Sequence, residues 1–175
     1  SFSVDQRLIL YDLRTNLAYL KFLGKAGVLG TNEVRRLSRG LEALRRHVEA
    51  NPEWARGESS EDVHTWVEEQ LEKKVGPVAR KFRTGRSRND LVATDLRLFV
   101  KDAVTELVRA ATVLLEALVR HARRHSRVVM PGYTHLQPAQ PILFSHYLLA
   151  YFEMLRRDAG RFVDCRARAD ELPMG

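Results

Sequence analysis

Residues 84–90 place small, amide and guanidinium side chains directly before the longest apolar-periodic stretch of the chain. They predict an anion-binding turn, because exposed backbone N–H groups at the start of a helix favour anions and the planar fork of an arginine matches a carboxylate. The alternative is a polar helix cap, in which Asn89 or Asp90 accepts from the backbone. The chemistry of a helix start leaves both interpretations open.

Residues 132–141 hold a histidine in a segment whose backbone is shaped by a glycine and two prolines. His135 is the candidate for chemistry, since imidazole is the side chain most easily tuned for proton transfer near neutral pH. Thr134 and Gln137 lie on either side of it in the sequence and could hold a substrate beside it. A single histidine in a loop is more often structural or solvated than catalytic, so a structural role stays open.

Residues 60–65 form a third polar group, in which Asp62 and His64 could build a network near a helix start. Ser60 together with Asp62 explains simple capping equally well. The Asp-X-His spacing also occurs in metal sites, but no third ligand is indicated nearby. These residues therefore predict a supporting role more than a reactive one.

Metal and thiol chemistry find little support elsewhere in the sequence. Cys165 is the single cysteine, so it predicts neither an internal disulfide nor a structural zinc site. His121 and His125 lie one helical turn apart, as metal ligands can, but the arginines among residues 123–127 would repel a cation. We therefore expect no metal.

The elements that must position these residues are predicted to be helices. Apolar residues recur at three- and four-residue steps in stretches that glycine, proline or capping residues bound. The predicted helices cover residues 4–25, 31–50, 62–75, 90–125 and 141–171. Thr31 or Asn32 is the expected cap of the second helix. Ser59 or Ser60 is the expected cap of the third, Pro141 opens the last, and no convincing strand pattern is present.

The two longest helices flank the histidine-bearing loop and should pack antiparallel, as in a helical bundle. Their apolar surface is too broad for two helices to bury alone, so further sequence or other subunits should complete the bundle. The predicted fold class is therefore all-α. It comprises a small N-terminal helical domain, residues 1–83, and long antiparallel helices that form the first part of a multi-helix bundle, residues 84–175.

Composition limits the class of partner. The chain has 175 residues, of which 45% are hydrophobic, and no apolar run is long enough for a membrane helix. We expect a soluble, cytoplasmic protein without a membrane partner. Lysine and arginine number 29 against 22 acidic residues, which gives a net charge of +7. Because the basic residues alternate with apolar ones, a solvated helix face is favoured over a nucleic-acid surface.

Residues 84–90, followed by residues 93–95, resemble the first signature of the argininosuccinate lyases, and residues 132–141 resemble the second. Further matches in order and spacing are residues 61–65, Ser1 and Asp5. The resemblance implies a fumarase/aspartase-like helix bundle, a homotetramer and active sites built from three subunits. It implies the elimination of fumarate from argininosuccinate to release arginine in arginine biosynthesis, without a cofactor.

The resemblance also implies roles for individual residues. His135 falls on the histidine assigned to proton transfer, and Thr134 on a substrate contact. The positions that hold the substrate, chiefly its dicarboxylate part, correspond to Ser87, Arg88 and Asn89, and Ser1 falls on a further substrate-binding serine. A supporting role is implied for Asp62, His64 and Gln137.

Members of this family carry their second catalytic group, a serine, in a flexible loop that lies further along the chain than Gly175. We therefore expect the complete protein to be a carbon–nitrogen lyase and the 175-residue chain to be inactive alone. A crystallin-like structural homologue remains an alternative, as does another fumarate-releasing lyase, acting on adenylosuccinate or aspartate. A basic helical nucleic-acid binder is the remaining alternative, and it would bind less tightly as salt increases.

Overall fold

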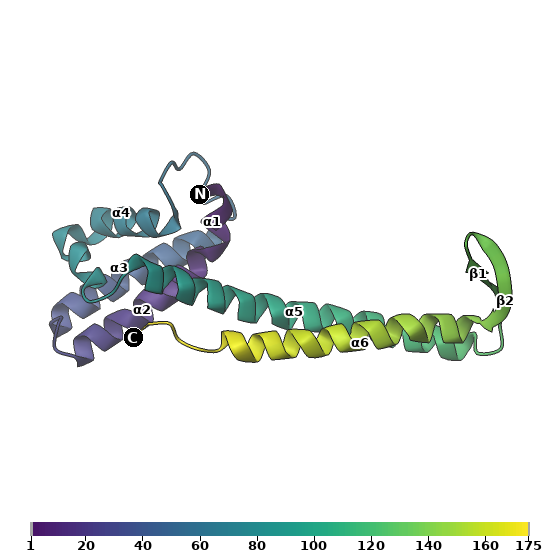
Figure 1. Cartoon of the computed structure of the whole chain (residues 1–175). Helices are drawn as coiled ribbons and strands as arrows, with labels where there is room; N and C mark the ends of the chain where they lie inside the picture. The colour runs from purple at the N-terminus through teal and green to yellow at the C-terminus, as the bar shows by residue number, and fades with distance from the viewer. Residues whose placement is uncertain (1, 175) are drawn as a thin grey trace. The chain divides into compact units, whose positions relative to one another are not determined.

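The computed structural model describes residues 2–174, which form two compact units. Unit 1 holds residues 2–99 and 171–174, and unit 2 holds residues 100–170. In chain order the elements are α1 (Phe2–Asp5), the 3-10 helix η1 (Gln6–Leu8), α2 (Ile9–Lys25), α3 (Thr31–Ala50), α4 (Val63–Val75), the 3-10 helix η2 (Gly76–Arg83), α5 (Arg88–Arg124), β1 (Val129–Thr134), β2 (Gln137–Leu143) and α6 (Phe144–Ala169) (Figure 1).

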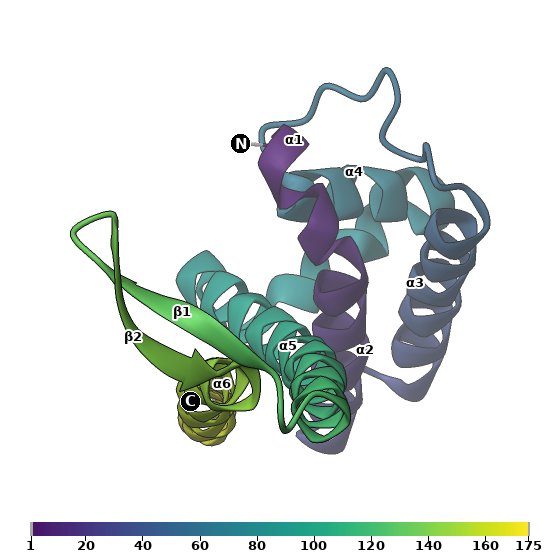
Figure 2. The same cartoon turned by 90° about the vertical axis from the view of Figure 1, so that its right-hand side faces the viewer.

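Helices α2, α3 and α4 build the core of unit 1, and each contacts the other two (Figure 2). The apolar stripe predicted for α3 is confirmed, because Leu37, Leu41, Leu44 and Val48 are all buried. Gly40 lies on the same helix, and a Cβ atom there would come within 2.6 Å of the Leu71 side chain of α4. The absence of a side chain at this position therefore lets α3 and α4 approach closely.

The caps of two helices differ from those predicted. Helix α3 begins at Thr31 with Gly30 as its N-cap, and the backbone N–H of Gly30 donates to the Glu33 carboxylate at 3.0 Å. Helix α4 is capped by Asp62, whose carboxylate accepts from the backbone N–H of Thr65 at 2.8 Å. Ser60 instead donates to Glu69, at 3.0 Å. A carboxylate at the N-cap also interacts favourably with the helix dipole.

Unit 2 consists of the α5 segment from Val100 onward, the hairpin of β1 and β2, and α6. The two helices run antiparallel side by side, with Arg166 of α6 donating to Thr105 of α5 at 3.2 Å (Figure 1). Among the described residues of this unit, Val104 and Ala122 are the buried apolar side chains. Much of the predicted apolar surface is exposed, with Val113 at 62% and Val163 at 58%. The pair of helices thus leaves an uncovered apolar face in this chain.

The segment between the long helices is a β-hairpin, so the expectation that no strand is present was wrong. Strands β1 and β2 are antiparallel, and their register is irregular between Pro131 and Tyr133. The last helix accordingly begins at Phe144, and Pro141 lies in β2 instead of opening it. Three prolines hide these strands, because proline within a run argues against a strand, and neither strand contains a buried residue.

The fold class is nevertheless the predicted one, a helical architecture with one small two-stranded sheet. The domain boundary at residue 83 stays a prediction. None of the helices in the described part of the chain combines the length and apolarity that a membrane crossing needs.

Candidate functional site

The start of α5 carries three of the predicted substrate-binding residues. The Ser87 hydroxyl accepts from the backbone N–H of Asn89 at 3.1 Å, and the Asp90 carboxylate accepts from the backbone N–H of Ser87 at 3.0 Å. Ser87 and Asp90 together therefore cap the helix in the manner of a capping box. The Asn89 side chain is exposed and has no hydrogen-bond partner within residues 2–174, so it is free to meet a ligand.

Arg88 is held by the N-terminus of α4. Its guanidinium donates to the Asp62 carboxylate at 2.5 Å and to the Thr65 hydroxyl at 3.0 Å. Burial opposes ionisation of Asp62, but hydrogen bonds from Thr65 and the charge of Arg88 outweigh it, so the pKa of Asp62 is lowered. The predicted supporting residue Asp62 thus caps α4 and fixes the direction of Arg88 at the same time.

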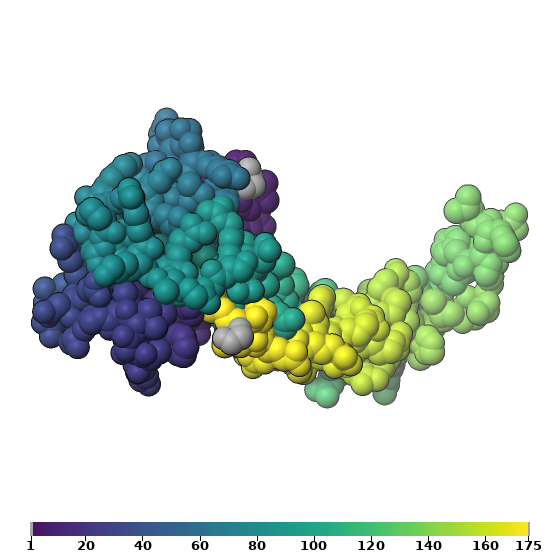
Figure 3. Space-filling model, turned by 60° about the vertical axis from the view of Figure 1, so that its left-hand side comes forward, coloured from purple at the N-terminus to yellow at the C-terminus, as the bar shows by residue number. Residues whose placement is uncertain are grey.

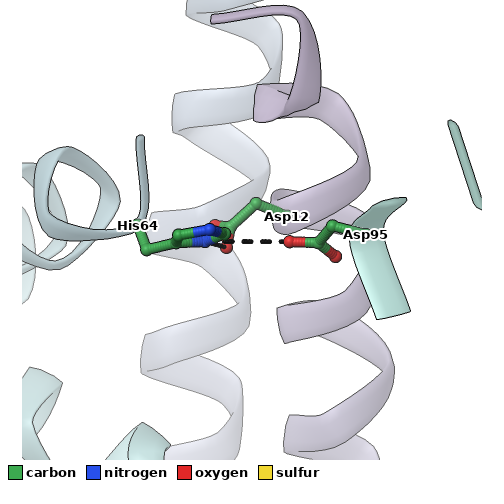
Figure 4. Close-up of side chains that lie close together, drawn as sticks. All are labelled: Asp12, His64 and Asp95. Carbon is green, nitrogen blue, oxygen red and sulfur yellow. Dashed lines mark hydrogen bonds and ion pairs between the residues drawn. The ribbon is translucent and has the colours of Figure 1, made fainter. Parts of the chain in front are cut away.

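His64, the other supporting residue of this segment, is buried in a cluster that the sequence analysis missed. Its Nδ1 donates to Asp12 Oδ1 at 2.7 Å and lies 3.7 Å from Asp95 Oδ2. The three side chains come from α4, α2 and α5, and Figure 4 shows the imidazole facing the two carboxylates. Thr15 donates to the other oxygen of Asp95 at 2.6 Å. The cluster therefore ties the first part of α5 to both neighbouring helices.

The charges in this cluster depend on one another. Burial disfavours the protonated imidazole, but the hydrogen bond and negative charge of Asp12, together with Asp95, outweigh it and raise the pKa of His64. Burial and the charge of Asp12 raise the pKa of Asp95 to about 8. Asp95 thus favours its neutral form at neutral pH, and the raised pKa of His64 makes its cationic form more favourable than that of an ordinary histidine.

The same three residues offer ligand atoms within 4.8 Å of one another, which is a spacing that could hold a metal ion. Asp95 favours its neutral form, however, and the remaining charge of Asp12 is compensated by the hydrogen bond from His64 and by the nearby guanidinium of Arg86. A proton and an arginine thus account for the arrangement without a divalent cation.

One pattern in the sequence could have indicated the cluster. Asp12 and Asn16 are four residues apart within the apolar face of α2, whose neighbours Leu13 and Leu20 are fully buried. Polar side chains on a buried helix face must find partners, because an unpaired buried polar group costs about 1–3 kcal/mol. Which partners they find cannot be read from that spacing.

The hairpin tip carries the remaining predicted residues. Thr134 and Gln137 are the last paired residues of the hairpin, and His135 and Leu136 form the two-residue turn between them. Both turn residues have positive φ, at 49° and 63°, as a type I′ turn requires. Residues other than glycine rarely adopt a positive φ. Backbone strain of this kind is concentrated at functional sites.

His135 is exposed, and no hydrogen bond to its side chain occurs among residues 2–174. Figure 3 shows the hairpin, in green, projecting from one end of unit 2. The imidazole therefore lies at the tip of the hairpin, and unit 2 does not itself enclose it.

The predicted site residues fall into two groups, each within its own unit. Unit 1 brings together Asp62 with Arg88, beside the cap formed by Ser87, and unit 2 brings together Thr134, His135 and Gln137. Ser1 lies outside the described residues. Its neighbour Phe2 is buried and packs against Trp54, with ring centroids 5.8 Å apart.

The sequence of this chain is similar to a known protein family and to curated relatives. Residues 1–175 match the family described as Lyase. Curated relatives called argininosuccinate lyase, from Pelotomaculum thermopropionicum and Geobacter metallireducens, are 45% and 40% identical to this chain over all 175 residues. The chain spans 38% of the length of these relatives.

Solved structures agree with this match. EDDS lyase in complex with formate is 30% identical, with a TM-score of 0.82, over 98% of this chain and 33% of that chain. A fumarate lyase from Mesorhizobium sp. BNC1 shares the fold with a TM-score of 0.75 and 20% identity, over 94% of this chain and 38% of that chain.

Proposed function

Because the chain belongs to the lyase family, we propose that the complete protein is an argininosuccinate lyase, which splits argininosuccinate into arginine and fumarate. The observation that carries this proposal is the 40–45% identity to argininosuccinate lyases along the whole chain. The match covers all 175 residues, so its range includes both candidate site segments, residues 84–90 and 132–141.

The proposed reaction is a β-elimination. A base removes a proton from the carbon next to a carboxylate of the succinyl part, and negative charge builds on that carboxylate. The electron pair then forms the double bond of fumarate as the bond to the guanidino nitrogen breaks. An acid delivers a proton to that nitrogen, so that the released arginine carries the stable guanidinium cation.

The start of α5 supplies donors for the carboxylates. Asn89 offers an exposed amide, Arg88 a guanidinium whose direction Asp62 sets, and Ser87 a hydroxyl at the positive end of the helix. Donors that are held in place before the reaction stabilise the developing charge at little reorganisation cost, and one good donor contributes about 3 kcal/mol to lowering the barrier. No cofactor takes part in this scheme.

At the hairpin tip, His135 is the candidate for a proton-transfer group, and Thr134 beside it is the candidate for a substrate contact. An imidazole exchanges protons near neutral pH, and its fixed position in a two-residue turn limits its motion. Because unit 2 leaves His135 exposed, other parts of the complete protein must exclude water around it. Gln137 pairs with Thr134 across the turn and supports its position.

Assembly into a homo-oligomer, a homotetramer in the complete protein, is part of the proposal. The uncovered apolar face on α5 and α6 supports it, since large exposed apolar patches mark interaction surfaces. A cytoplasmic enzyme of arginine biosynthesis is the corresponding cellular role.

A lyase for a different N-substituted aspartate is the second candidate. EDDS lyase, which has been solved with bound fumarate, is 30% identical over 98% of this chain. Such an enzyme would use the same donors for the succinyl part and differ in the leaving group.

The deciding experiment measures fumarate release by the purified complete protein from argininosuccinate, adenylosuccinate, aspartate and EDDS. We expect the highest kcat/KM with argininosuccinate. Release from one of the other substrates alone would reassign the leaving group, whereas release from none would favour a structural homologue.

A further inference from the structure

Arg86 lies in the turn between η2 and α5, two residues before Arg88, and it points into unit 1. Its guanidinium carbon lies 4.7 Å from the centre of the Tyr19 ring and 5.3 Å from that of the Phe82 ring. One terminal nitrogen donates to the side-chain oxygen of Asn16. The other, Nη1, is buried and has no hydrogen-bond partner among the described residues. Nη1 is thus shielded from solvent, and the guanidinium faces α2.

The backbone of the same turn is fastened to the same stretch of α2. The Tyr19 hydroxyl donates to the carbonyl oxygen of Thr84 at 2.8 Å. Gly85 has a φ of 79°, and a Cβ atom there would lie 3.4 Å from that hydroxyl. Residues 84–86 therefore contact α2 through one backbone bond and one side chain, and both contacts involve the Tyr19 ring or hydroxyl.

A continuous chain of buried groups leads from this turn to the core. Asn16, which accepts from Arg86, donates to Asp12 at 2.8 Å, and Asp12 accepts from His64 of α4. Each of these hydrogen bonds holds its two groups in place, because breaking it would leave a buried group unpaired in a medium of low dielectric. The position of Arg86 is consequently set by two helices.

We propose that Arg86 is a positioning residue for the start of α5. Its guanidinium fixes residues 84–86, and through them it fixes the cap residue Ser87 and the side chains of Arg88 and Asn89 that follow. This inference rests on the proposed function, because it takes these three residues as the substrate-binding ones.

The two arginines of this turn therefore have different duties. Arg88 lies at the N-termini of α4 and α5, where its partners Asp62 and Thr65 leave it half exposed. Arg86 lies inside the unit, where burial lowers its pKa and the negative charge of Asp12 opposes that effect. With Nη2 bonded to Asn16 and Nη1 buried, the guanidinium of Arg86 is directed at α2 and not at the exposed start of α5.

The test replaces Arg86 with alanine in the complete protein. A displacement of about 1 Å in a binding group can cost about 100-fold in rate, so we expect kcat/KM for argininosuccinate to fall about 100-fold. Free guanidinium at low millimolar concentration should restore part of the activity, whereas the same concentration of sodium chloride should not. The matched control is Arg80→Ala, because Arg80 is a surface cation of η2 whose partner is Glu72.

Hydrogen exchange of the unliganded protein separates positioning from direct contact. Amides in residues 84–90 should exchange at least about 10-fold faster in Arg86→Ala than in the parent, and guanidinium should slow them again. Tyr19→Phe removes the hydrogen bond to Thr84 and leaves the ring in place. It should therefore also speed the exchange of these amides and lower kcat/KM, but by less than Arg86→Ala. This milder variant keeps the test informative if Arg86→Ala does not fold.

Two outcomes would overturn the proposal. One is a kcat/KM within about threefold of the parent in Arg86→Ala. The other is a large loss of activity with unchanged exchange in residues 84–90, which would mean that Arg86 binds substrate directly. If the parent protein releases no fumarate, the proposed function fails, while the exchange comparison still decides whether Arg86 fixes the turn.

Discussion

At the scale of single residues, the same side-chain types perform different tasks in the two units. His64 is buried between two carboxylates that raise its pKa, whereas His135 is exposed at a strained turn. Only the second is accessible to a substrate, so only the second is a candidate for proton transfer. The first belongs to a network that stabilises unit 1.

His135→Asn tests the proton-transfer role. Asparagine also adopts positive φ readily, so the two-residue turn should persist and the unfolding temperature should stay within a few degrees of the parent. Fumarate release should fall by at least about 100-fold, because one positioned acid or base contributes about 100- to 10,000-fold. Circular dichroism with the fumarate assay checks both parts, and activity within a few fold of the parent would remove His135 from the mechanism.

The buried cluster predicts how stability depends on pH. The folded pKa of Asp95 is about 8, against an ordinary value of 3.8, so folding takes up a proton between these two values and stability falls as pH rises through this window. The pKa of His64 is raised from 6.5, so its contribution is complete below 6.5 and is also lost as pH rises. Asp95 and His64 therefore both make the protein less stable as pH rises.

We therefore expect the melting temperature of the complete protein to fall between pH 6.5 and about pH 8. The Asp95→Asn variant keeps the shape of the side chain and cannot ionise, so its melting temperature should decline less over the same range. A parent protein whose melting temperature rises across this window would show that the cluster does not hold the proton assigned to it.

At the scale of elements, one residue connects two helix starts. Asp62 accepts from the N–H of Thr65 as the cap of α4, and its other oxygen pairs with Arg88 at the start of α5. Capping α4 and holding Arg88 are thus not alternatives for Asp62. The α5 cap is supplied by Ser87 and Asp90, which leaves Asn89 available.

Two substitutions separate the duties of Asp62. Asp62→Asn keeps an oxygen for the cap and loses the charge that holds Arg88, whereas Asp62→Ala loses both. Urea unfolding should show Asp62→Ala to be less stable than Asp62→Asn by about 1 kcal/mol, which is the value of an N-cap. Both variants should lose a similar part of kcat/KM, because both remove the carboxylate charge that pairs with Arg88. Equal stability of the two variants would contradict the assigned cap.

At the scale of the whole molecule, the apolar face of α5 and α6 is the surface that favours contact with further helices. Val113 and Val163 are more than half exposed, and Leu107 and Met154 are also exposed. Burial of apolar surface contributes about 25 cal/mol per Å², which favours covering such a face with further helices. The chain spans 38% of the length of its argininosuccinate lyase relatives, so those relatives have additional sequence that could serve this purpose.

We predict that the 175-residue chain releases no fumarate from argininosuccinate by itself. If active sites combine subunits, refolding it together with the complete protein carrying His135→Asn should restore measurable turnover, because the short chain supplies an intact His135 and the long chain supplies the rest. Each protein alone is the control. Turnover by the short chain alone would refute the prediction, and a mixture no more active than its parts would argue against shared sites.

Local patterns in the sequence were sufficient to predict most of the helices. Apolar residues at three- and four-residue spacing predicted α3 and the long α5 closely, because a helix buries one face along its whole length. The resemblance also selected His135 and the α5 start as candidate site segments. The two strands were not predicted, because proline within a run argues against a strand and neither strand contains a buried residue.

Tertiary structure alone decided which polar groups meet. His64 and Asp12 are 52 residues apart in the sequence, and Thr15 and Asp95 are 80 apart. Nothing in either local pattern selects the partner, because a buried polar group is satisfied by whatever donor or acceptor the packing of the helices brings within reach. Packing also turned Arg86 inward and left Arg88 at the surface, although the two arginines have the same chemistry and are separated by one residue.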